Sequence, residues 1–506
     1  MKRVIAIMIC AALLALCGCE AEKAPYVPTG DALTDETTGT LPPASAGQQE
    51  ISLVYYPERS LNPYECTDYT NRVLFSLIYQ GLFAVDRNYA VSPILCQSYN
   101  VSKDLRSWTF YVAEAYFSDG TKVTAGDVVA SLEAAKGSAY YGGRLQHVAS
   151  ITGYGDAVIV ELDTPMENLP ILLDIPVVKA SEVKGARPLG SGPYLLGDGV
   201  LRRQAGWWCY SANLSVSCDT IPLVDVESTA QIRDAFEFYD VSLVCSDPGA
   251  ADYVDFRSDY ELWDSENGQF LYMVCSSKST VFAHASVRSA LTHAIDREAL
   301  VQTYYHGFAR AATLPASPQS PYYNAALAAD YGYDLEKIRE AVTSANLEGK
   351  EISLLMNGDD VMRQRVGRAI GDMLEEVGLK VTIVEASGEE FTKQLKKGNY
   401  DLYLGQTKLS ANMDLSAFFG TNTSLNYGGL SDPANYALSL EALANAGNYY
   451  NLYKTVMEEA WLCPILFQNY AVYVDRGGLP GLSPARDNVF YYTVGRTMAD
   501  ALMGGG

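Results

Sequence analysis

The sequence predicts an α/β protein, and three observations support this prediction. Residues 351–404 alternate between strand-like and helix-like segments, which is typical of a parallel open sheet. Residues 228–244 read as one helix followed by one strand. The chain has 506 residues, of which 48% are hydrophobic and 19% charged. It can therefore bury a large core and is long enough for roughly three domains of ~150 residues.

The run from 351 to 404 carries the clearest α/β pattern. Strands are expected at 351–356, 379–385 and 400–404, with helices at 361–377 and from Ser387 to Gly398. Ser387 and Glu390 have the spacing of a capping box, and Gly378 and Gly398 suit the helix ends. Parallel strands joined in this way bind ligands beyond their carboxyl ends. We therefore expect ligand contacts in the loop at 405–415.

The first residues predict export. Lys2 and Arg3 precede an apolar run to Leu16 that is too short for a membrane span of ~20 residues. Leu16-Cys17-Gly18-Cys19 resembles a bacterial lipobox, which implies a signal peptide at 1–18 and a diacylglycerol on Cys19; two acyl chains hold a protein stably to a bilayer. Ordinary secretion with cleavage nearby is the alternative. Residues 19–50 have no apolar period and are expected to form a flexible tether.

The next segments are expected to alternate between short strands and helices. Strands are predicted at 51–56, 107–112, near Ile151 and at 158–162, and a helix at 73–82. Thr124 and Asp127 form a second capping-box pattern, for a helix that ends at Gly137. Gly190-Ser191-Gly192 is not a nucleophile elbow, because that motif needs glycine two residues on either side of serine. These glycines are expected to permit a tight backbone turn.

Residues 284–323 predict two helices followed by an extended segment. Apolar residues from Val287 to Ile295 follow a helical period after a possible N-cap at Ser286. Asp296 is expected to cap the second helix, which ends at Gly307. Three prolines then favour extended backbone. Further elements are expected to be a helix at 335–344, a helix at 448–461 and a strand at 464–474.

Three stretches carry a family resemblance. VRSALTHAIDREALVQTYYHGFARAATLPASPQSPYY resembles the signature region of the family 5 solute-binding proteins of ABC importers, the peptide and nickel class. FSDGTKVTAGDVVASLEAAK resembles a turn and helix near the start of those proteins, and PLGSGPY resembles their Gly-Thr-Gly-Pro-Tyr segment. The stretches occur in the family order across nearly the whole mature chain.

The resemblance implies a two-lobed α/β fold of the periplasmic-binding-protein type (class II), with a hinge between the lobes. Lobe I would comprise residues 51–270 and 464–506, including a small subdomain at about 85–188, and lobe II residues 271–463. Such a protein is not an enzyme and needs no cofactor. A monomer on the outer face of the cell membrane would capture oligopeptides or dipeptides between its lobes. It would deliver them to an ABC permease and ATPase complex.

The resemblance also implies ligand contacts on both lobes. Peptide binders carry a Trp and an Asp in the loop near 408–415, and this Asp pairs with the α-amino group of the peptide. Lys408 stands at the Trp position and Ala411 at the Asp position, so recognition of a free amino terminus is in doubt. Asp414 is the substitute, unless it caps a helix starting at Leu415. The expected ligand-binding residues are Tyr69, Thr70, Gln406, Lys408, Asn412 and Asp414.

Composition excludes several other functions. The formal charge of −23 argues against nucleic acid and anionic membrane surfaces as partners. Seven cysteines follow the leader, and Cys209 and Cys218 are the pair that could bridge, although free buried thiols are expected for most. Neither the cysteines nor the four histidines have metal-site spacing. A nickel chelate as ligand, a sensory or structural lipoprotein and a secreted hydrolase remain the alternatives; no nucleophile and base pattern supports the hydrolase.

Overall fold

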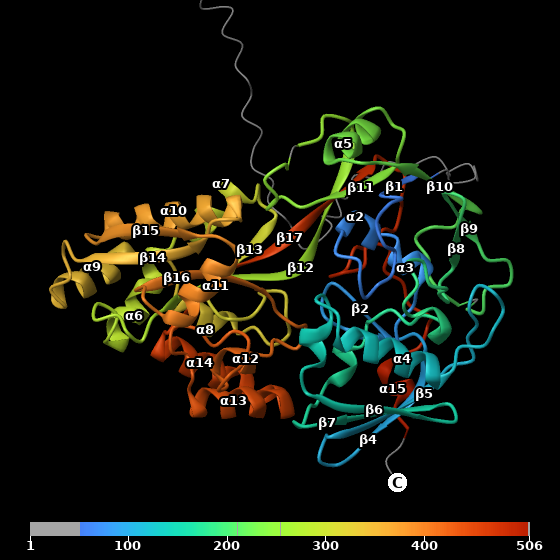
Figure 1. Ribbon diagram of the computed structural model, residues 1–506, viewed down its shortest axis with the longest axis horizontal. Coiled ribbons are helices and arrows are strands. Elements are labelled where there is room, and N and C mark those ends of the chain that lie inside the picture. Colours follow the sequence, from blue (N-terminus) through green and yellow to red (C-terminus); the bar gives the residue numbers. More distant parts are fainter. Residues whose placement is uncertain (1–50, 210, 254, 504–506) are drawn as a thin grey trace, which may run out of the picture.

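The computed structural model describes residues 51–209, 211–253 and 255–503. The predicted signal peptide, the predicted tether and Cys19 lie outside these residues. We call residues 51–270 and 464–506 lobe I, and residues 271–463 lobe II. Figure 1 shows the two lobes side by side, with two long strands running from one to the other. The structure thus has the two-lobed α/β fold that the sequence predicted.

One mixed sheet of 11 strands passes through both lobes, in the order β15-β14-β16-β12-β17-β11-β1-β10-β9-β8, with β13 paired to β17. The strands of lobe II are β13 (Ala309–Ala311), β14 (Glu351–Asn357), β15 (Lys380–Ala386) and β16 (Leu402–Lys408). The two strands that cross between the lobes are β12 (Tyr260–Cys275) and β17 (Leu462–Asp475). The strands of lobe I are β1 (Leu53–Tyr55), β8 (Tyr194–Gly197), β9 (Val200–Arg203), β10 (Thr220–Asp225) and β11 (Leu243–Ser246). The antiparallel pair β12 and β17 joins the lobes.

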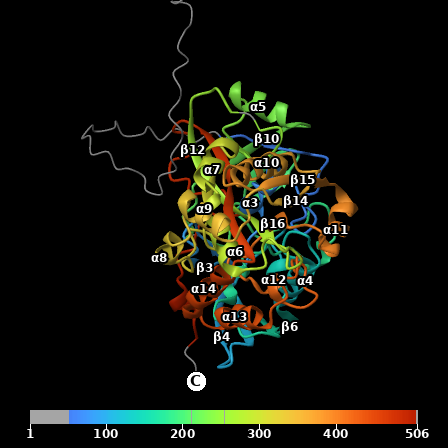
Figure 2. The same cartoon turned by 90° about the vertical axis from the view of Figure 1, so that its left-hand side faces the viewer.

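The predicted βαβαβ run is confirmed. β14 pairs in parallel with both β15 and β16, and α10 (Val361–Glu376) and α11 (Gly388–Lys397) are the crossover helices. Ile352, Leu354 and Met356 face a core shared with α10, whereas Leu355 faces the opposite side. A strand that is covered on both faces has a nearly continuous apolar sequence, and β14 shows this pattern. Figure 2 shows α7 and α9 on one side of this sheet and α11 on the other.

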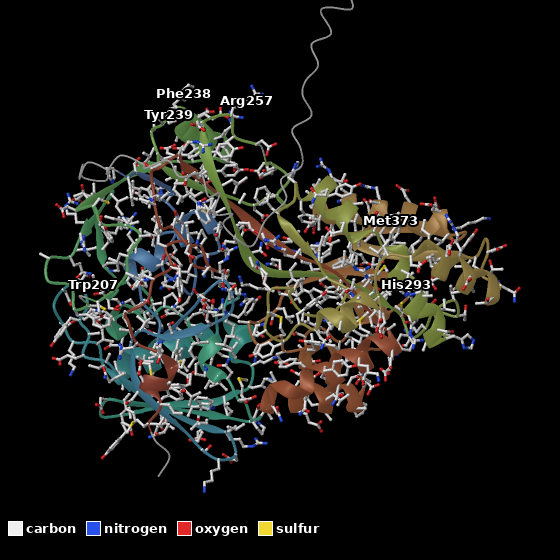
Figure 3. All side chains as sticks on the ribbon, turned by 180° about the vertical axis from the view of Figure 1, so that it is seen from behind. Trp207, Phe238, Tyr239, Arg257, His293 and Met373 are labelled. Atoms are coloured by element: carbon white, nitrogen blue, oxygen red, sulfur yellow. The ribbon has the colours of Figure 1, made fainter. Side chains whose placement is uncertain are left out.

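The remaining helices cover the sheet or fill the ends of the lobes. In lobe I they are α2 (Tyr69–Arg72), α3 (Phe75–Ile78), α5 (Thr229–Glu237) and α15 (Met498–Ala501). In lobe II they are α6 (Ala285–Leu291), α7 (Arg297–Tyr304), α8 (Ala325–Ala329), α9 (Leu335–Ser344), α12 (Ser416–Phe419), α13 (Pro433–Ala444) and α14 (Tyr449–Glu459). Phe238 and Tyr239, just after α5, point away from the body near Arg257, as Figure 3 shows, and are 75% and 61% exposed.

A separate four-stranded sheet with one helix occupies the middle of the stretch predicted as the small subdomain. Its strands are β4 (Cys96–Val101), β5 (Ser107–Val112), β6 (Val148–Tyr154) and β7 (Ala157–Leu162), in the order β4-β5-β7-β6. Helix α4 (Ala125–Lys136) packs on β6 and β7. The capping box of Thr124 and Asp127 is confirmed. The hairpin of β2 (Phe83–Val85) and β3 (Val91–Pro93) precedes this sheet.

Several local predictions were wrong. Of the helix expected at 73–82, only the four residues of α3 (Phe75–Ile78) are helical, because Tyr79 is already extended. Ser387 makes no capping bond, since Glu390 bonds Lys393 and Gln394 instead. His284, not Ser286, is the residue before α6. Cys209 and Cys218 do not bridge, and all seven cysteines among the described residues are free.

Glycine is required at two sites where a side chain would collide with neighbouring atoms. Gly190 and Gly192 lie against the backbone of α3, and a Cβ at either would come within 2.1 or 2.5 Å of Ile78. The reason for these glycines is therefore close backbone approach rather than a turn. Gly268, in an irregular part of β12, has a φ of +73°, and a Cβ there would meet the guanidinium of Arg486 at 2.3 Å. This crossing strand bends where the lobes meet.

Candidate functional site

The predicted ligand-binding residues of lobe II do not share one loop. β16 continues to Lys408 because it pairs with β12 as far as Gln269, so Gln406 and Lys408 lie in the strand. The loop was predicted to begin at residue 405, and this start was wrong because the strand extends to Lys408. Asn412 and Asp414 lie in the turn before α12. Tyr69 and Thr70 begin α2 in lobe I.

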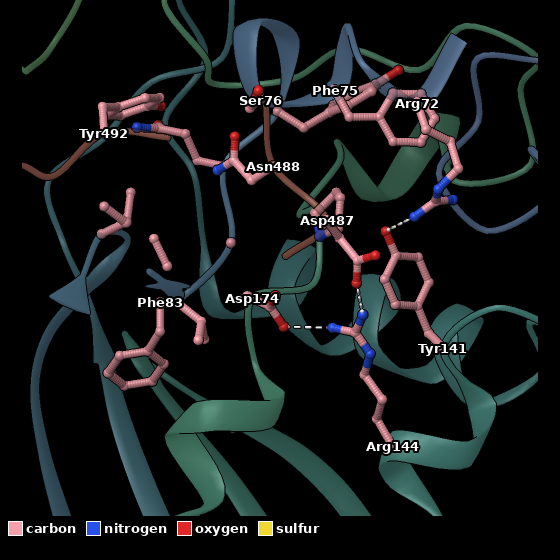
Figure 4. A pocket seen from close by; sticks show the side chains of 17 residues that line it. Arg72, Phe75, Ser76, Phe83, Tyr141, Arg144, Asp174, Asp487, Asn488 and Tyr492 are labelled. Atoms are coloured by element: carbon pink, nitrogen blue, oxygen red, sulfur yellow. Dashed lines mark hydrogen bonds and ion pairs between the residues drawn. The ribbon is translucent and has the colours of Figure 1, made fainter. Parts of the chain in front are cut away.

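Lys408 is bound by side chains of lobe I. Its ammonium lies 2.7 Å from Oδ1 of Asp487, 2.9 Å from the Tyr140 hydroxyl and 2.8 Å from the carbonyl oxygen of Asn267. Arg144 pairs with Asp487 from the other side and also with Asp174. We call Lys408, Asp487, Tyr140, Arg144 and Asp174 the Asp487 cluster. Figure 4 shows Arg144 between its two carboxylates, beside a cavity of about 70 Å³ in lobe I.

Charge in the Asp487 cluster is balanced by the protein itself. Burial lowers the pKa of Lys408, and the positive charges of Arg144 and Arg486 lower it further against the pull of Asp487. Burial would raise the pKa of Asp487, but Lys408 and the two arginines outweigh it and hold that pKa far below its usual range. The cluster joins the lobes through groups that already satisfy each other.

Asp414 also makes a contact between the lobes. One carboxylate oxygen accepts from Nε2 of Gln146 at 2.5 Å and lies 3.0 Å from Nε2 of His147, both in the small subdomain. The other oxygen accepts from the backbone N–H of Ser416, the first residue of α12, at 2.8 Å. The helix starts one residue later than expected, but Asp414 does serve its N-terminus. Both carboxylate oxygens of Asp414 therefore already accept hydrogen bonds from the protein.

The protonation of this pair favours opposite charges. Burial would lower the pKa of His147, but its bonds to Asp414 and Asp163 raise it above the ordinary value. Burial would raise the pKa of Asp414, but His147 and Ser416 lower it below the ordinary value. A protonated His147 and an ionised Asp414 thus stabilise each other across the lobe boundary.

Asn412 lies apart from the other predicted residues. Its side-chain oxygen accepts from the Ser410 hydroxyl at 2.7 Å, and its carbonyl oxygen accepts from the Tyr449 hydroxyl. It lines a cavity of about 360 Å³ between the small subdomain and lobe II. There the N–H of Glu167 donates to the carbonyl oxygen of Leu443 at 2.8 Å. The Asp487 cluster, Asp414 and this backbone hydrogen bond thus each bring the two lobes into direct contact.

Gln406 belongs to a row of three glutamines on adjacent strands. Its amide nitrogen lies 3.4 Å from Oε1 of Gln269 on β12, and its oxygen lies 3.3 Å from Nε2 of Gln468 on β17. Gln468 also approaches the hydroxyl of Tyr305, at 3.4 Å. We call Gln269, Gln406 and Gln468 the glutamine row. Gln269 and Gln468 were missed; Gln468, a polar residue inside the apolar run at 464–474, was the signal that could have found them.

Tyr69 and Thr70 line a cavity of about 210 Å³ in lobe I. Tyr69 stacks on Tyr470 of β17, with ring centroids 3.5 Å apart. Asp247, directly after β11, lies in the same cavity. A Cβ on Gly249 would lie 3.3 Å from the ring of Tyr305 and 3.4 Å from Oε1 of Gln468. The cavity therefore adjoins the glutamine row, and Asp247 is a further residue that sequence reasoning missed.

The two lobes, the crossing strands and the polar groups between the lobes define a solute-binding protein. The family model for the middle of bacterial extracellular solute-binding proteins, family 5, matches residues 90–429. The chain belongs to this family, whose members are extracytoplasmic and supply ABC importers with small solutes. The resemblance inferred from the three sequence stretches is confirmed.

Known proteins agree with this assignment. The glutathione-binding protein GsiB of Escherichia coli O1:K1 is 26% identical over 361 residues, which cover 67% of this chain and 70% of GsiB. The putative peptide-binding protein AppA of Clostridium difficile has a TM-score of 0.71 at 15% identity, covering 87% of this chain and 98% of AppA. A nickel ABC transporter protein of Bacillus halodurans has a TM-score of 0.71 at 17% identity, covering 88% and 99%. The relatives are binding proteins rather than enzymes.

Two features are absent from the residues that the structure describes. No helix between residues 51 and 503 combines the length and apolar character that crossing a membrane requires. Within the same part of the chain, no three His, Cys, Asp or Glu residues are grouped so that they could hold a metal ion.

Proposed function

We propose that this protein captures short peptides, or solutes with peptide-like amides, between its lobes for an ABC permease and ATPase. The glutamine row is the observation that carries the proposal. Gln269 and Gln468 lie on the two strands that join the lobes, and Gln406 lies on the adjacent strand β16 of lobe II. Their mutual bonds of 3.3–3.4 Å are long. Each amide has two donors and an acceptor that accepts twice, so spare groups remain for a ligand main chain.

The sites of closure support the same proposal. A ligand that touches the glutamine row and Tyr69 contacts both lobes, so it stabilises the closed form by its preference for that form. The Asp487 cluster and the Asp414–His147 pair add contacts that form only when the lobes meet. The permease would then distinguish the closed protein from the open one.

Calorimetry with peptide mixtures tests this function. We expect dipeptides or oligopeptides to bind, and Gln406→Ala and Gln468→Ala each to weaken binding about 2–10-fold, as the loss of one or two neutral hydrogen bonds predicts. Gln302→Ala, at an exposed position of α7, is the matched control and should bind normally. Binding of another class of solute, such as a nickel chelate, with no binding of peptides would contradict the proposal.

We also propose that the protein is a monomer anchored to the outer face of the cell membrane through a lipid on Cys19. Support comes from the lipobox-like sequence at 16–19 and the tether that follows it. Cells expressing the protein should label it with a radioactive fatty acid and retain it in the membrane fraction. Cys19→Ser should lose both properties, and retention of the label in that variant would exclude Cys19 as the anchor.

A further inference from the structure

We propose that the cavity beside Tyr69 binds a cationic group of the ligand, the α-ammonium of a short peptide, with Asp247 as its counter-ion. This inference rests on the proposed function and names the chemistry of one end of the site. The loop that would receive the amino group in related peptide binders has Ala411, and both oxygens of its Asp414 already accept hydrogen bonds from the protein. If the amino terminus of a peptide is recognised, a carboxylate elsewhere in the cleft must therefore pair with its ammonium group.

Asp247 is a carboxylate without a cation. Its Oδ1 accepts from the backbone N–H of Gly249 at 2.8 Å, and it forms no ion pair with any residue that the structure describes. Burial raises its pKa, and the nearby carboxylates of Asp360 and Asp252 raise it further. A bound ammonium would supply the missing positive charge, and charge-assisted hydrogen bonds are the strong ones in such sites.

The two arginines on the cavity wall already have carboxylate partners, and the remaining charged side chain, Asp252, is acidic. Arg59 pairs with Asp68 and Arg233 with Asp234. Asp252, like Asp247, is in no ion pair among the described residues. Among the described residues, the cavity thus keeps two carboxylates that are in no ion pair and no arginine that lacks a carboxylate, which favours a cationic ligand over an anionic one.

The walls of the cavity are aromatic, which also favours a cation. Tyr56, Tyr69, Tyr253 and Phe256 line it. One cation is already bound in this way, since the guanidinium of Arg59 lies 3.6 Å from the ring centroid of Tyr56. Aromatic faces attract cations through their quadrupole. A carboxylate among such rings recognises an ammonium group better than a neutral amide.

The cavity is placed so that the rest of a peptide can reach the glutamine row. The turn that holds Asp247 runs close to Tyr305 of lobe II and Gln468 of β17, since a Cβ added at Gly249 would lie 3.3 Å from the first and 3.4 Å from the second. Tyr253 packs on His306 of lobe II, with ring centroids 4.8 Å apart. An ammonium at Asp247 therefore lies at the lobe boundary, with the main chain that follows it directed past Gln468.

The test compares a free peptide with its N-acetylated form by calorimetry, using the tightest-binding dipeptide or tripeptide. We expect the wild-type protein to bind the free peptide at least about tenfold tighter, the loss expected for one charged hydrogen bond. Asp247→Asn and Asp247→Ala should reduce the ratio to below about threefold. Asp240→Asn makes the same change of charge at an exposed position of lobe I and should keep the wild-type ratio.

Three results would overturn the inference. The wild-type protein could bind both forms equally, or both Asp247 variants could keep the wild-type ratio while folding normally by circular dichroism. In either case peptide binding stands and only the subsite falls. If the wild-type protein bound neither form of any peptide, the proposed function would fail, and the subsite with it.

Discussion

Two regions where the lobes meet treat charge in opposite ways. In the Asp487 cluster, Lys408 and Arg144 flank one carboxylate, and the side chains of Lys408 and Asp487 are only 17% and 10% exposed. In the cavity beside Tyr69, Asp247 has no cation and its pKa is raised. The first region is complete without a ligand, whereas the second lacks one positive charge. This difference supports our proposal that the cluster stabilises closure and that the cavity selects the ligand.

The largest expected effect is in the Asp487 cluster. Asp487→Ala leaves Lys408 and Arg144 buried without their shared carboxylate, and breaking a buried pair typically costs about 3–5 kcal/mol. Urea denaturation should show a loss of this size in the free energy of unfolding. Asp234→Asn, in an exposed pair with Arg233, should show no measurable change. A loss below about 1 kcal/mol for Asp487→Ala would mean that the cluster contributes little.

A substitution in the cavity beside Tyr69 is expected to have a smaller effect and to stabilise the protein rather than destabilise it. An Asp whose folded pKa is raised stabilises the fold only below its ordinary pKa, and this stabilisation is lost as pH rises through the raised value. At pH 7.5, Asp247→Asn should therefore increase the free energy of unfolding by about 0.5–2 kcal/mol, the usual size of such gains at functional sites. The gain should disappear toward pH 4. A less stable variant at pH 7.5 would show that other groups of the protein stabilise the ionised Asp247 carboxylate.

The smallest effect concerns His147 and Asp414. The raised pKa of His147 contributes stability that is complete below about pH 6.5 and is lost as pH rises through the folded pKa. The lowered pKa of Asp414 contributes stability above about pH 4 that is lost as pH falls. The free energy of unfolding should thus decline between pH 6 and 8 as His147 loses its proton.

Variants of two histidines separate this contribution from other titrations. His147→Gln should flatten the decline between pH 6 and 8, because the charged partner of Asp414 is gone. His284→Gln, at an exposed position before α6, should keep it. The same decline in both variants would assign the pH dependence to other groups.

The sequence predicted the parts of the fold that depend on local pattern. The helical period of Val366 and Ile370 and the left-handed Gly398, with a φ of +65°, are visible without tertiary contacts, so the βαβαβ run was found. Strand β12 was missed because Asp264 and Glu266 make it look polar. Their partners, such as Arg310 for Asp264 and Ser317 for Glu266, are supplied by other segments.

The candidate site was harder to predict than the fold, because its contacts depend even more on residues that are distant in sequence. Lys408 and Asp414 were recognised as departures from the family pattern, but their partners lie far away in sequence: Asp487 is 79 residues from Lys408, and His147 is 267 residues from Asp414. No local pattern shows that these side chains are already engaged. The absence of a partner for Asp247 is likewise a property of the assembled cleft, since it depends on what α2, α5 and lobe II bring to the cavity.

Hydrogen–deuterium exchange with and without the tightest-binding peptide tests the central claim, that a solute is held between the lobes, most directly. The account predicts that bound peptide slows exchange in both lobes at once, in the segments at 68–72 and 245–250 of lobe I and in β16 of lobe II. Slower exchange confined to one lobe, with the other unchanged at saturating peptide, would contradict it.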